Sequence, residues 1–280
     1  MSIGILVEKR YLSQAQPNGL ILALRAAGQE TLCLDPEESA YALDDSRWTE
    51  NLDIIVARGR SFHLLCMLGW AEARGVHAIN RRSAIASVHN KADMAVLLAK
   101  ARLPTPKTFL GPVQELYKTI PSQIYPIILK PIFGDNSRGL RLVHTPEEMK
   151  LVEWPEPVAL AQRFIANDGY DLKLYGIGDE IYSVRKPSPF GLAVNGGIGG
   201  VKSREAKVEL VPLTAGLAEL GRSLRLLFGL ELYGVDCIET PEGPVVIEVN
   251  EFPNYTGVPD ADRRLADYVI HARRDKERTS

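Results

Sequence analysis

The chain has 280 residues, of which 45% are apolar and 24% are charged, so it has enough apolar material for a hydrophobic core. Its 33 basic and 35 acidic side chains give a net charge of -2, which disfavours a nucleic-acid surface and a membrane patch. Three widely spaced cysteines argue against a disulfide framework and a cysteine zinc site. We expect a cytoplasmic protein, because the first apolar run is too short for a signal peptide and none approaches the ~18 residues of a membrane span.

The first 80 residues alternate short apolar strands with helices. Strands are expected over 3–7, 31–34, 54–57 and 76–79, with helices over 19–27 and 64–74. This alternation favours a parallel sheet covered by helices, as in a Rossmann-like lobe. No G-x-G-x-x-G follows the first strand, so we expect no dinucleotide site there.

The middle of the chain begins with one long expected helix over 83–101, which ends before Leu103-Pro104-Thr105-Pro106 because proline disfavours helix in the residue before it. A further helix is expected after Thr145, an N-cap residue followed by proline. Later segments read as antiparallel hairpins around one more helix, and residues from 271 onward as a polar tail. The remaining expected elements are strands over 127–130, 140–143, 172–176, 180–185, 233–239 and 245–250, and a helix over 214–228.

The last hairpin carries a cluster of oxygen-bearing side chains. Glu248 and Asn250 are two residues apart on one strand and so point to the same face. A three-residue loop over 241–243 would set Asp236 directly opposite Glu248. Facing carboxylates repel unless a cation lies between them, and hard oxygen ligands suit Mg²⁺ shared with nucleotide phosphates. The alternative is incidental acids on a solvated sheet face.

A second signal is Lys130, which ends the apolar run 127–130 and precedes a glycine-bearing loop over 134–139. Backbone N–H groups of such a loop, together with the lysine, fit a phosphate clamp. The loop is not a P-loop, because Leu140-Arg141 follows where Lys-Ser/Thr is required and a strand follows where a helix is required. Taken alone, the segment is equally compatible with a plain glycine hairpin.

In order and spacing, these segments resemble the ATP-grasp superfamily and, within it, the RimK-like carboxylate–amine ligases, from about residue 3 to 270. The residues that carry the resemblance are His89-Asn90-Lys91-Ala92-Asp93, Leu103-Pro104-Thr105-Pro106, Lys130 with its loop, Ala161-Gln162-Arg163-Phe164-Ile165, Gly169-Tyr170-Asp171-Leu172-Lys173, Asp236 and Glu248-Val249-Asn250.

The resemblance implies an ATP-grasp fold of α/β and α+β class. It places an N-terminal Rossmann-like parallel-sheet lobe over 1–80 and a small central lid domain over 81–165. A C-terminal antiparallel-sheet domain with the metal site is expected over 166–272, followed by the polar tail over 273–280.

The resemblance also implies cofactors and their binding residues. The cofactors are ATP and Mg²⁺, expected as two ions, with Mn²⁺ as a substitute. Asp236, Glu248 and Asn250 are the implied metal ligands. The implied nucleotide-binding residues are the two lysines Lys91 and Lys130, the loop residues Gly134, Ser137 and Gly139, the adenine-holding strand Gln162, Arg163, Phe164 and Ile165, and Asp171 near the ribose.

Substrate roles are implied for four further residues. Arg185 and Asn195 resemble the family's Arg…Asn-x-x-x-Gly-Gly segment beside the acyl phosphate, and Arg58 and Lys173 are candidate substrate contacts. Surface charge is the alternative for Arg58 and Arg185. The sequence departs from the family in having Arg163 where an acid is common, Lys173 where arginine is usual, and no arginine just before Asn195.

The implied activity joins a small-molecule carboxylate to an amine through an acyl phosphate, with release of ADP and phosphate. A homo-oligomer would be usual in such a family. Two other classes stay open: a small-molecule kinase on the same fold, and a nucleotide-binding regulatory module without turnover. The kinase is suggested by the segment 251–257, which resembles the metal-site end of inositol polyphosphate kinases. Cations for a phosphorylated polyol could come from Arg58, Arg60, Arg185, Lys186, Lys202 and Arg204.

Overall fold

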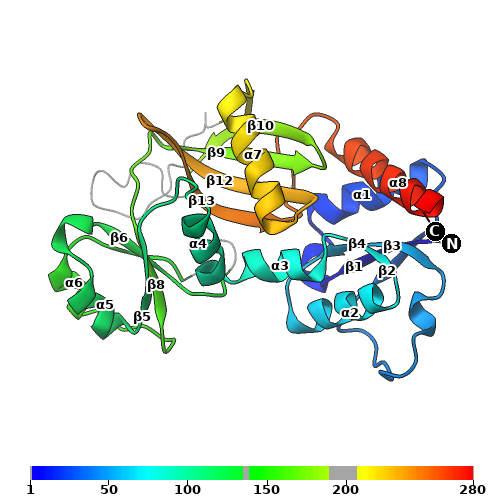
Figure 1. The fold of residues 1–280 in the computed structure, drawn as a ribbon, viewed down its shortest axis with the longest axis horizontal. Coiled ribbons are helices and arrows are strands. Elements are labelled where there is room, and N and C mark those ends of the chain that lie inside the picture. Colours follow the sequence, from blue (N-terminus) through cyan, green and yellow to red (C-terminus); the bar gives the residue numbers. More distant parts are fainter. Residues whose placement is uncertain (1, 135–138, 189–206, 280) are drawn as a thin grey trace.

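The computed structural model describes residues 2–134, 139–188 and 207–279, with side chains to Arg274. The described residues form three sheets that follow one another along the chain, one parallel and two antiparallel (Figure 1). This arrangement confirms the predicted fold class.

The N-terminal sheet is parallel, with strand order β2-β1-β3-β4. Its central strands are apolar throughout because both faces are covered. Helix α1 packs on the face that carries Ile3 and Ile5, and helix α2 packs on the face that carries Leu6. The elements are β1 (Ser2–Val7), α1 (Ala15–Ala26), β2 (Thr31–Leu34), β3 (Leu52–Arg58), α2 (Phe62–Ala73) and β4 (His77–Ile79), with 3-10 turns at Lys9–Tyr11 and Arg47–Thr49.

The central sheet is antiparallel, with order β5-β8-β6-β7. Helices α5 and α6 cover the face that carries Ile127, Leu129 and Ala161. The opposite face therefore carries Lys130 and Gln162. As predicted, Thr145 caps α6 by accepting a hydrogen bond from the Glu148 N–H (3.2 Å). The elements are β5 (Thr108–Gly111), α5 (Val113–Thr119), β6 (Ile127–Lys130), β7 (Arg141–Val143), α6 (Pro146–Lys150) and β8 (Ala159–Arg163), with a 3-10 turn at Ser122–Ile124.

The C-terminal sheet is antiparallel, with order β11-β10-β9-β12-β13. One face packs its apolar residues, such as Leu174 and Val249, against helices α3, α4 and α7. The residues that alternate with them, including Lys173, Asp236 and Glu248, point to the other face. The elements are β9 (Tyr170–Ile177), β10 (Glu180–Pro187), β11 (Glu209–Val211), α7 (Ala215–Phe228), β12 (Leu232–Thr240) and β13 (Gly243–Glu251).

The single helix expected over 83–101 is wrong, because the chain forms two helices there, α3 (Arg82–His89) and α4 (Lys91–Lys100). Asn90 ends the first helix in an extended conformation and caps the second, its side-chain oxygen accepting from the N–H groups of Ala92 and Asp93. An asparagine N-cap of this kind satisfies N–H groups that a new helix leaves unpaired. The break makes Lys91 the first residue of α4.

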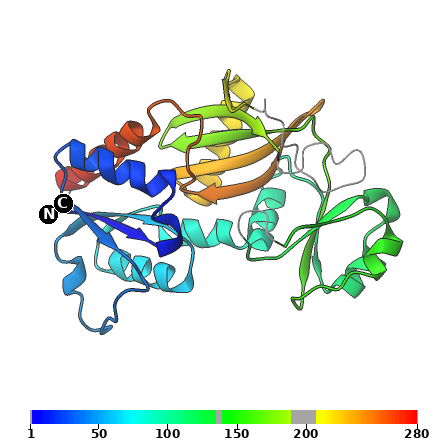
Figure 2. The same ribbon diagram turned by 180° about the vertical axis from the view of Figure 1, so that it is seen from behind.

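The polar tail expected at the C-terminus is also wrong. Residues Ala261–Thr279 form one helix, α8, which lies beside α1 in both views (Figures 1 and 2). Its apolar residues Leu265 and Val269 are buried in the core of the N-terminal lobe. Arg273, a member of the expected tail, forms an ion pair with Asp53 of β3 at 2.8 Å. The charged segment therefore closes back on the first sheet.

Within the described ranges, no helix is long and apolar enough to cross a membrane.

Candidate functional site

The hairpin of β12 and β13 sets Asp236 opposite Glu248, as predicted, but by a different route. The turn has two residues and pairs Thr240 with Gly243, so the expected three-residue loop is wrong. Cys237 pairs with Val246 while Asp236 pairs with Glu248, which leaves Ile247 as a β-bulge. The short turn and the extra residue cancel, and the two carboxylates face each other.

Each of these carboxylates is paired with a lysine. Lys173 on β9 lies opposite Asp236 in the strand register and forms an ion pair with it. Lys91, brought in by the start of α4, forms an ion pair with Glu248. The two positive charges compensate the repulsion that the facing acids would otherwise suffer.

Asn250 completes the candidate metal site, because it is two residues beyond Glu248 on β13 and shares its face. In the described part of the chain, no three His, Cys, Asp or Glu side chains gather as a metal cluster. The donors of the candidate site are the carboxylates of Asp236 and Glu248 and the side-chain oxygen of Asn250. Such hard oxygen donors fit Mg²⁺, whose remaining ligands in nucleotide sites are waters and phosphate oxygens.

Lys130 ends β6 on the uncovered face of the central sheet. Its ammonium donates a hydrogen bond to the Gln162 side-chain oxygen at 2.6 Å, and the Gln162 amide donates to the Thr108 hydroxyl at 3.2 Å. Burial lowers the pKa of Lys130 to about 8, and the negative charges of Glu248 and Asp236 partly oppose that decrease. At neutral pH the lysine is still mostly a cation, held rigidly where it can meet an anion.

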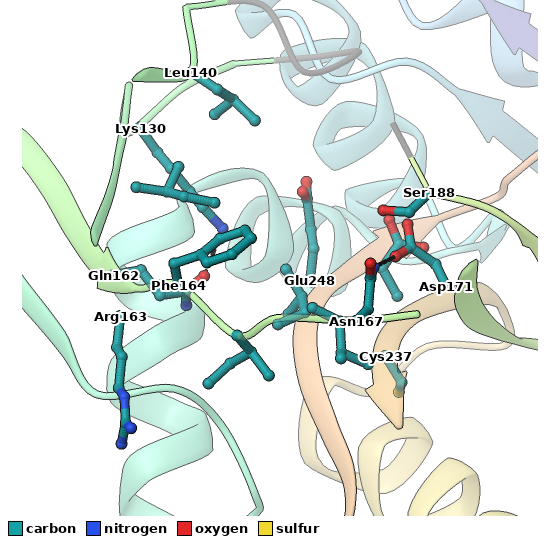
Figure 3. A pocket seen from close by; sticks show the side chains of 15 residues that line it. Lys130, Leu140, Gln162, Arg163, Phe164, Asn167, Asp171, Ser188, Cys237 and Glu248 are labelled. Atoms are coloured by element: carbon teal, nitrogen blue, oxygen red, sulfur yellow. Dashed lines mark hydrogen bonds between the residues drawn. The ribbon is translucent and has the colours of Figure 1, made fainter. Parts of the chain in front are cut away.

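A pocket opens between the central and C-terminal sheets (Figure 3). The empty space of this pocket, including the part of its mouth that is open to solvent, is about 670 Å³. Lys130 and Gln162 line one side and Glu248 lines the other. The remaining lining residues are Ile128, Leu140, Arg163, Phe164, Ile165, Asn167, Asp171, Ser188, Asp236, Cys237, Ile238 and Ile247.

Asp171 lies at the far side of this pocket on β9. Its carboxylate accepts a hydrogen bond from the Asn167 amide at 3.0 Å, shown dashed in Figure 3, and another from Ser188. Burial raises the pKa of Asp171, and the Ser188 hydrogen bond acts against that increase. A carboxylate held in this way can accept further hydrogen bonds from ligand hydroxyl groups.

Sequence reasoning missed several lining residues. Asn167 lies in a polar run without a motif, Ser188 directly follows β10, and Cys237 lies next to Asp236 on β12. Only the strand pairing brings them to one pocket. Arg163, by contrast, lines the rim and points away from Lys130 and Glu248 in Figure 3.

Of the basic residues predicted to contact substrate, Lys173 lies at the candidate site beside Asp236, whereas Arg185 and Arg58 do not line the pocket and are engaged by the protein. Arg185 forms an ion pair with Asp168 and stacks over the Tyr170 ring at 4.3 Å. Arg58 ends β3 in the N-terminal lobe, where it donates to the Gln14 side chain at 3.1 Å.

Gly134 and Gly139 border the glycine loop, and Gly139 has the positive φ of 73° that glycine tolerates. Ser137 and Asn195 lie outside the described residues.

The chain is similar in sequence to known proteins. A family model for the RimK-like ATP-grasp domain matches residues 88–270. An inositol-tetrakisphosphate 1-kinase 1 of Arabidopsis thaliana is 25% identical over 94% of this chain and 92% of its own. A probable alpha-L-glutamate ligase of Maridesulfovibrio salexigens is 26% identical over 96% of this chain and 95% of its own.

Solved structures share the fold at lower identity. The structure of the ATP-grasp ligase PsnB complexed with minimal precursor, Mg and ADP superposes with a TM-score of 0.71 at 17% identity, covering 97% of each chain. The family model spans more than half of the chain and includes Lys91, Lys130 and all three candidate metal ligands. The chain therefore belongs to the RimK-like ATP-grasp family.

Proposed function

We propose that the protein is an ATP-dependent carboxylate–amine ligase that releases ADP and phosphate. One observation carries the proposal: three lysines converge with the opposed pair Asp236 and Glu248 at a pocket between two sheets. Cations for phosphates and oxygen ligands for a metal are what phosphoryl transfer from ATP requires.

In this proposal the chain's own residues bind and orient the nucleotide. Gln162 to Ile165 hold the adenine between the sheets, and the Asp171 carboxylate accepts hydrogen bonds from the ribose hydroxyls. Lys91 and Lys130 direct their ammonium groups to the phosphates. Asp236, Glu248 and Asn250 would hold Mg²⁺, which supplies charge neutralisation on the phosphate oxygens when bound.

The lysine–carboxylate pairs are suited to an exchange of partners. If Lys91 turned to a phosphate, Glu248 would be released to ligate Mg²⁺, and the same would hold for Lys173 and Asp236. In the proposed reaction the γ-phosphoryl group passes to the substrate carboxylate with release of ADP. The amine then attacks the acyl phosphate and phosphate leaves, with the lysines preorganised to stabilise the developing charge.

A small-molecule kinase is the second candidate. The Arabidopsis relative named as an inositol-tetrakisphosphate kinase matches nearly the whole chain, which favours it. The family model and the relatives named as alpha-L-glutamate ligases favour the ligase, which we therefore place first.

The distinguishing experiment is a phosphate-release screen with ATP, Mg²⁺ and matrices of carboxylates and amines, glutamate among them. A ligase releases free phosphate only when acid and amine are both present, and mass spectrometry finds an amide. A phosphate ester formed without free phosphate would establish the kinase. Tight ATP binding with no ADP formation across the screen would instead indicate a regulatory module. The Lys130→Ala and Glu248→Ala variants should each abolish turnover.

We further propose the finer features that the family resemblance implies. These are two Mg²⁺ ions replaceable by Mn²⁺, roles for Ser137 and Asn195 beside the phosphates, substrate contacts from Arg58, Arg185 and Lys173, and domain boundaries near 80, 165 and 272. A homo-oligomer acting in the cytoplasm is also proposed, and the free thiols Cys33, Cys66 and Cys237 suit a reducing compartment. Light scattering during gel filtration would determine the oligomeric state.

A further inference from the structure

A buried ion pair joins the N-terminal lobe to the end of the strand that carries the candidate metal ligands. Arg60 follows β3, and Glu251 is the last residue of β13, directly after Asn250. The Arg60 Nε and Glu251 Oε1 atoms are 3.1 Å apart, and the two side chains are only 8% and 2% exposed. The pair therefore connects residues 191 positions apart in the chain in an environment largely without water.

The arginine end of this pair is itself rigidly held. The buried carboxylate of Glu8 accepts hydrogen bonds from the backbone N–H groups of Arg60 and Ser61, at 2.5 and 2.6 Å. Gly59 adopts φ 143°, and a Cβ there would lie 2.4 Å from a Glu8 carboxylate oxygen. These contacts hold the loop after β3 in the conformation in which Arg60 reaches Glu251 of β13.

The glutamate end controls the orientation of the strand. Successive residues of a strand point to opposite faces, so Glu251 points into the protein while Asn250 and Glu248 point to the metal face. The chain beyond it is pinned as well: the Phe252 N–H donates to the Leu232 carbonyl at 3.0 Å, and Phe252 is fully buried with a φ of 36°. With Glu251 anchored, the strand has little freedom to rotate its metal-facing side chains.

A gain in folding stability does not by itself account for a buried ion pair of this kind. Burying two charges costs several kcal/mol of desolvation, and apolar replacements of similar size are often equally stable. A fixed geometry is what the ion pair adds, since an arginine Nε–carboxylate contact has one preferred direction.

We propose that Arg60 and Glu251 are positioning residues for the metal site, which set the orientation of Glu248 and Asn250 from the N-terminal lobe. The inference rests on the proposed function, because it assigns Mg²⁺ to these ligands. Through this ion pair the N-terminal lobe would influence metal binding, although neither Arg60 nor Glu251 would touch the metal.

The test measures ADP affinity by calorimetry, once with saturating Mg²⁺ and once in EDTA. The ratio of the two dissociation constants reports how strongly the metal site supports nucleotide binding. Residues that orient metal ligands typically contribute 10- to 100-fold to metal affinity, so Glu251→Gln is expected to lower this ratio by about 10-fold or more. Affinity in EDTA is expected to stay within about 3-fold of wild type, because neither residue lines the nucleotide pocket. Arg60→Lys, which keeps the charge, should recover part of the ratio that Arg60→Met loses.

The matched control is Arg273→Gln, which breaks a partly buried ion pair of the N-terminal lobe, formed with Asp53 at 2.8 Å and involving no residue of β13. It should lower the thermal midpoint as Glu251→Gln does but leave the ratio unchanged. Equal ratios in wild type, Glu251→Gln and Arg273→Gln would overturn the positioning role and leave the ligase proposal intact. A wild-type ratio near one would refute the metal site itself and the proposed function with it.

Discussion

The buried ammonium of Lys130 makes a quantitative prediction about stability and pH. Burial lowers the pKa of this lysine from 10.5 to about 8 in the folded protein. At 1.36 kcal/mol per pH unit, the folded state carries a penalty of about 3 kcal/mol for holding the charge below pH 8. The unfolded chain keeps its proton up to about pH 10.5, so the free energy of unfolding should rise as pH increases from 8 toward 10.5.

The Lys130→Met variant keeps the side-chain volume and removes this linkage. Between pH 7 and pH 10, the unfolding free energy of wild type should therefore gain about 2 to 3 kcal/mol relative to the variant. Buried tyrosines such as Tyr175 and Tyr233, whose pKa is raised to about 12 by burial, titrate identically in both proteins and cancel in the difference.

The assay is urea unfolding followed by tryptophan fluorescence, without nucleotide and with EDTA, at pH 7, 8, 9 and 10. Exposed Lys100 supplies the matched control as Lys100→Met, whose curve should run parallel to wild type. Parallel curves for wild type and Lys130→Met across this range would show that Lys130 is not held as a desolvated cation. The phosphate-clamp role would then lose its physical basis.

Three further predictions test the site and the packing. Glu248→Gln should reduce amine-dependent phosphate release by at least about 100-fold while the thermal midpoint changes little, and substantial residual turnover would contradict its role as metal ligand. Asn80→Ala removes hydrogen bonds to the Leu232 carbonyl and N–H and should cost about 3 kcal/mol in urea unfolding; a loss under about 1 kcal/mol would mean that water replaces the amide. Gly176→Ala places a Cβ 2.0 Å from the Tyr233 ring, which cannot swing away because its hydroxyl donates to the Gly221 carbonyl. We expect the free energy of unfolding, measured in urea, to fall by at least about 2 kcal/mol, and an unchanged value would refute this packing.

Local patterns alone predicted much of the fold. Thr145 begins its helix as expected because N-cap chemistry acts over three residues. The alternation in the first 80 residues predicted the parallel sheet, since strands buried on both faces must be apolar throughout. Glu248 and Asn250 share a face because the period of a strand is two.

Chain order and spacing also led to the correct family, and with it to Lys91, Lys130 and Asp236 as candidate site residues. These are single side chains at the ends or centres of well-defined elements. Lys130 and Asp236 are charged residues within apolar runs, whereas Lys91 is recognised only by its place in the ordered set of motifs. The tests of their roles are still to be made.

Only the tertiary structure decided which groups meet. The bulge at Ile247, which restores the pairing of Asp236 with Glu248, depends on the register against β12 and leaves no trace in composition. The break at Asn90 replaced a continuous helix, because the start of α4 is packed against the C-terminal sheet, where Lys91 reaches Glu248.

The engagement of the arginines was likewise invisible in the sequence. Arg60 and Glu251 are separated by 191 residues, and no local sequence pattern predicts that their side chains form a buried ion pair. The charged C-terminal residues expected to be a solvated tail continue helix α8, whose preceding residues Leu265 and Val269 are buried in the core of the first lobe. The sequence by itself determined the element types and the residues able to do the chemistry, because these follow from short-range periodicity and residue type. The partners of those residues were decided by the tertiary structure, because pairing across the chain depends on register and packing.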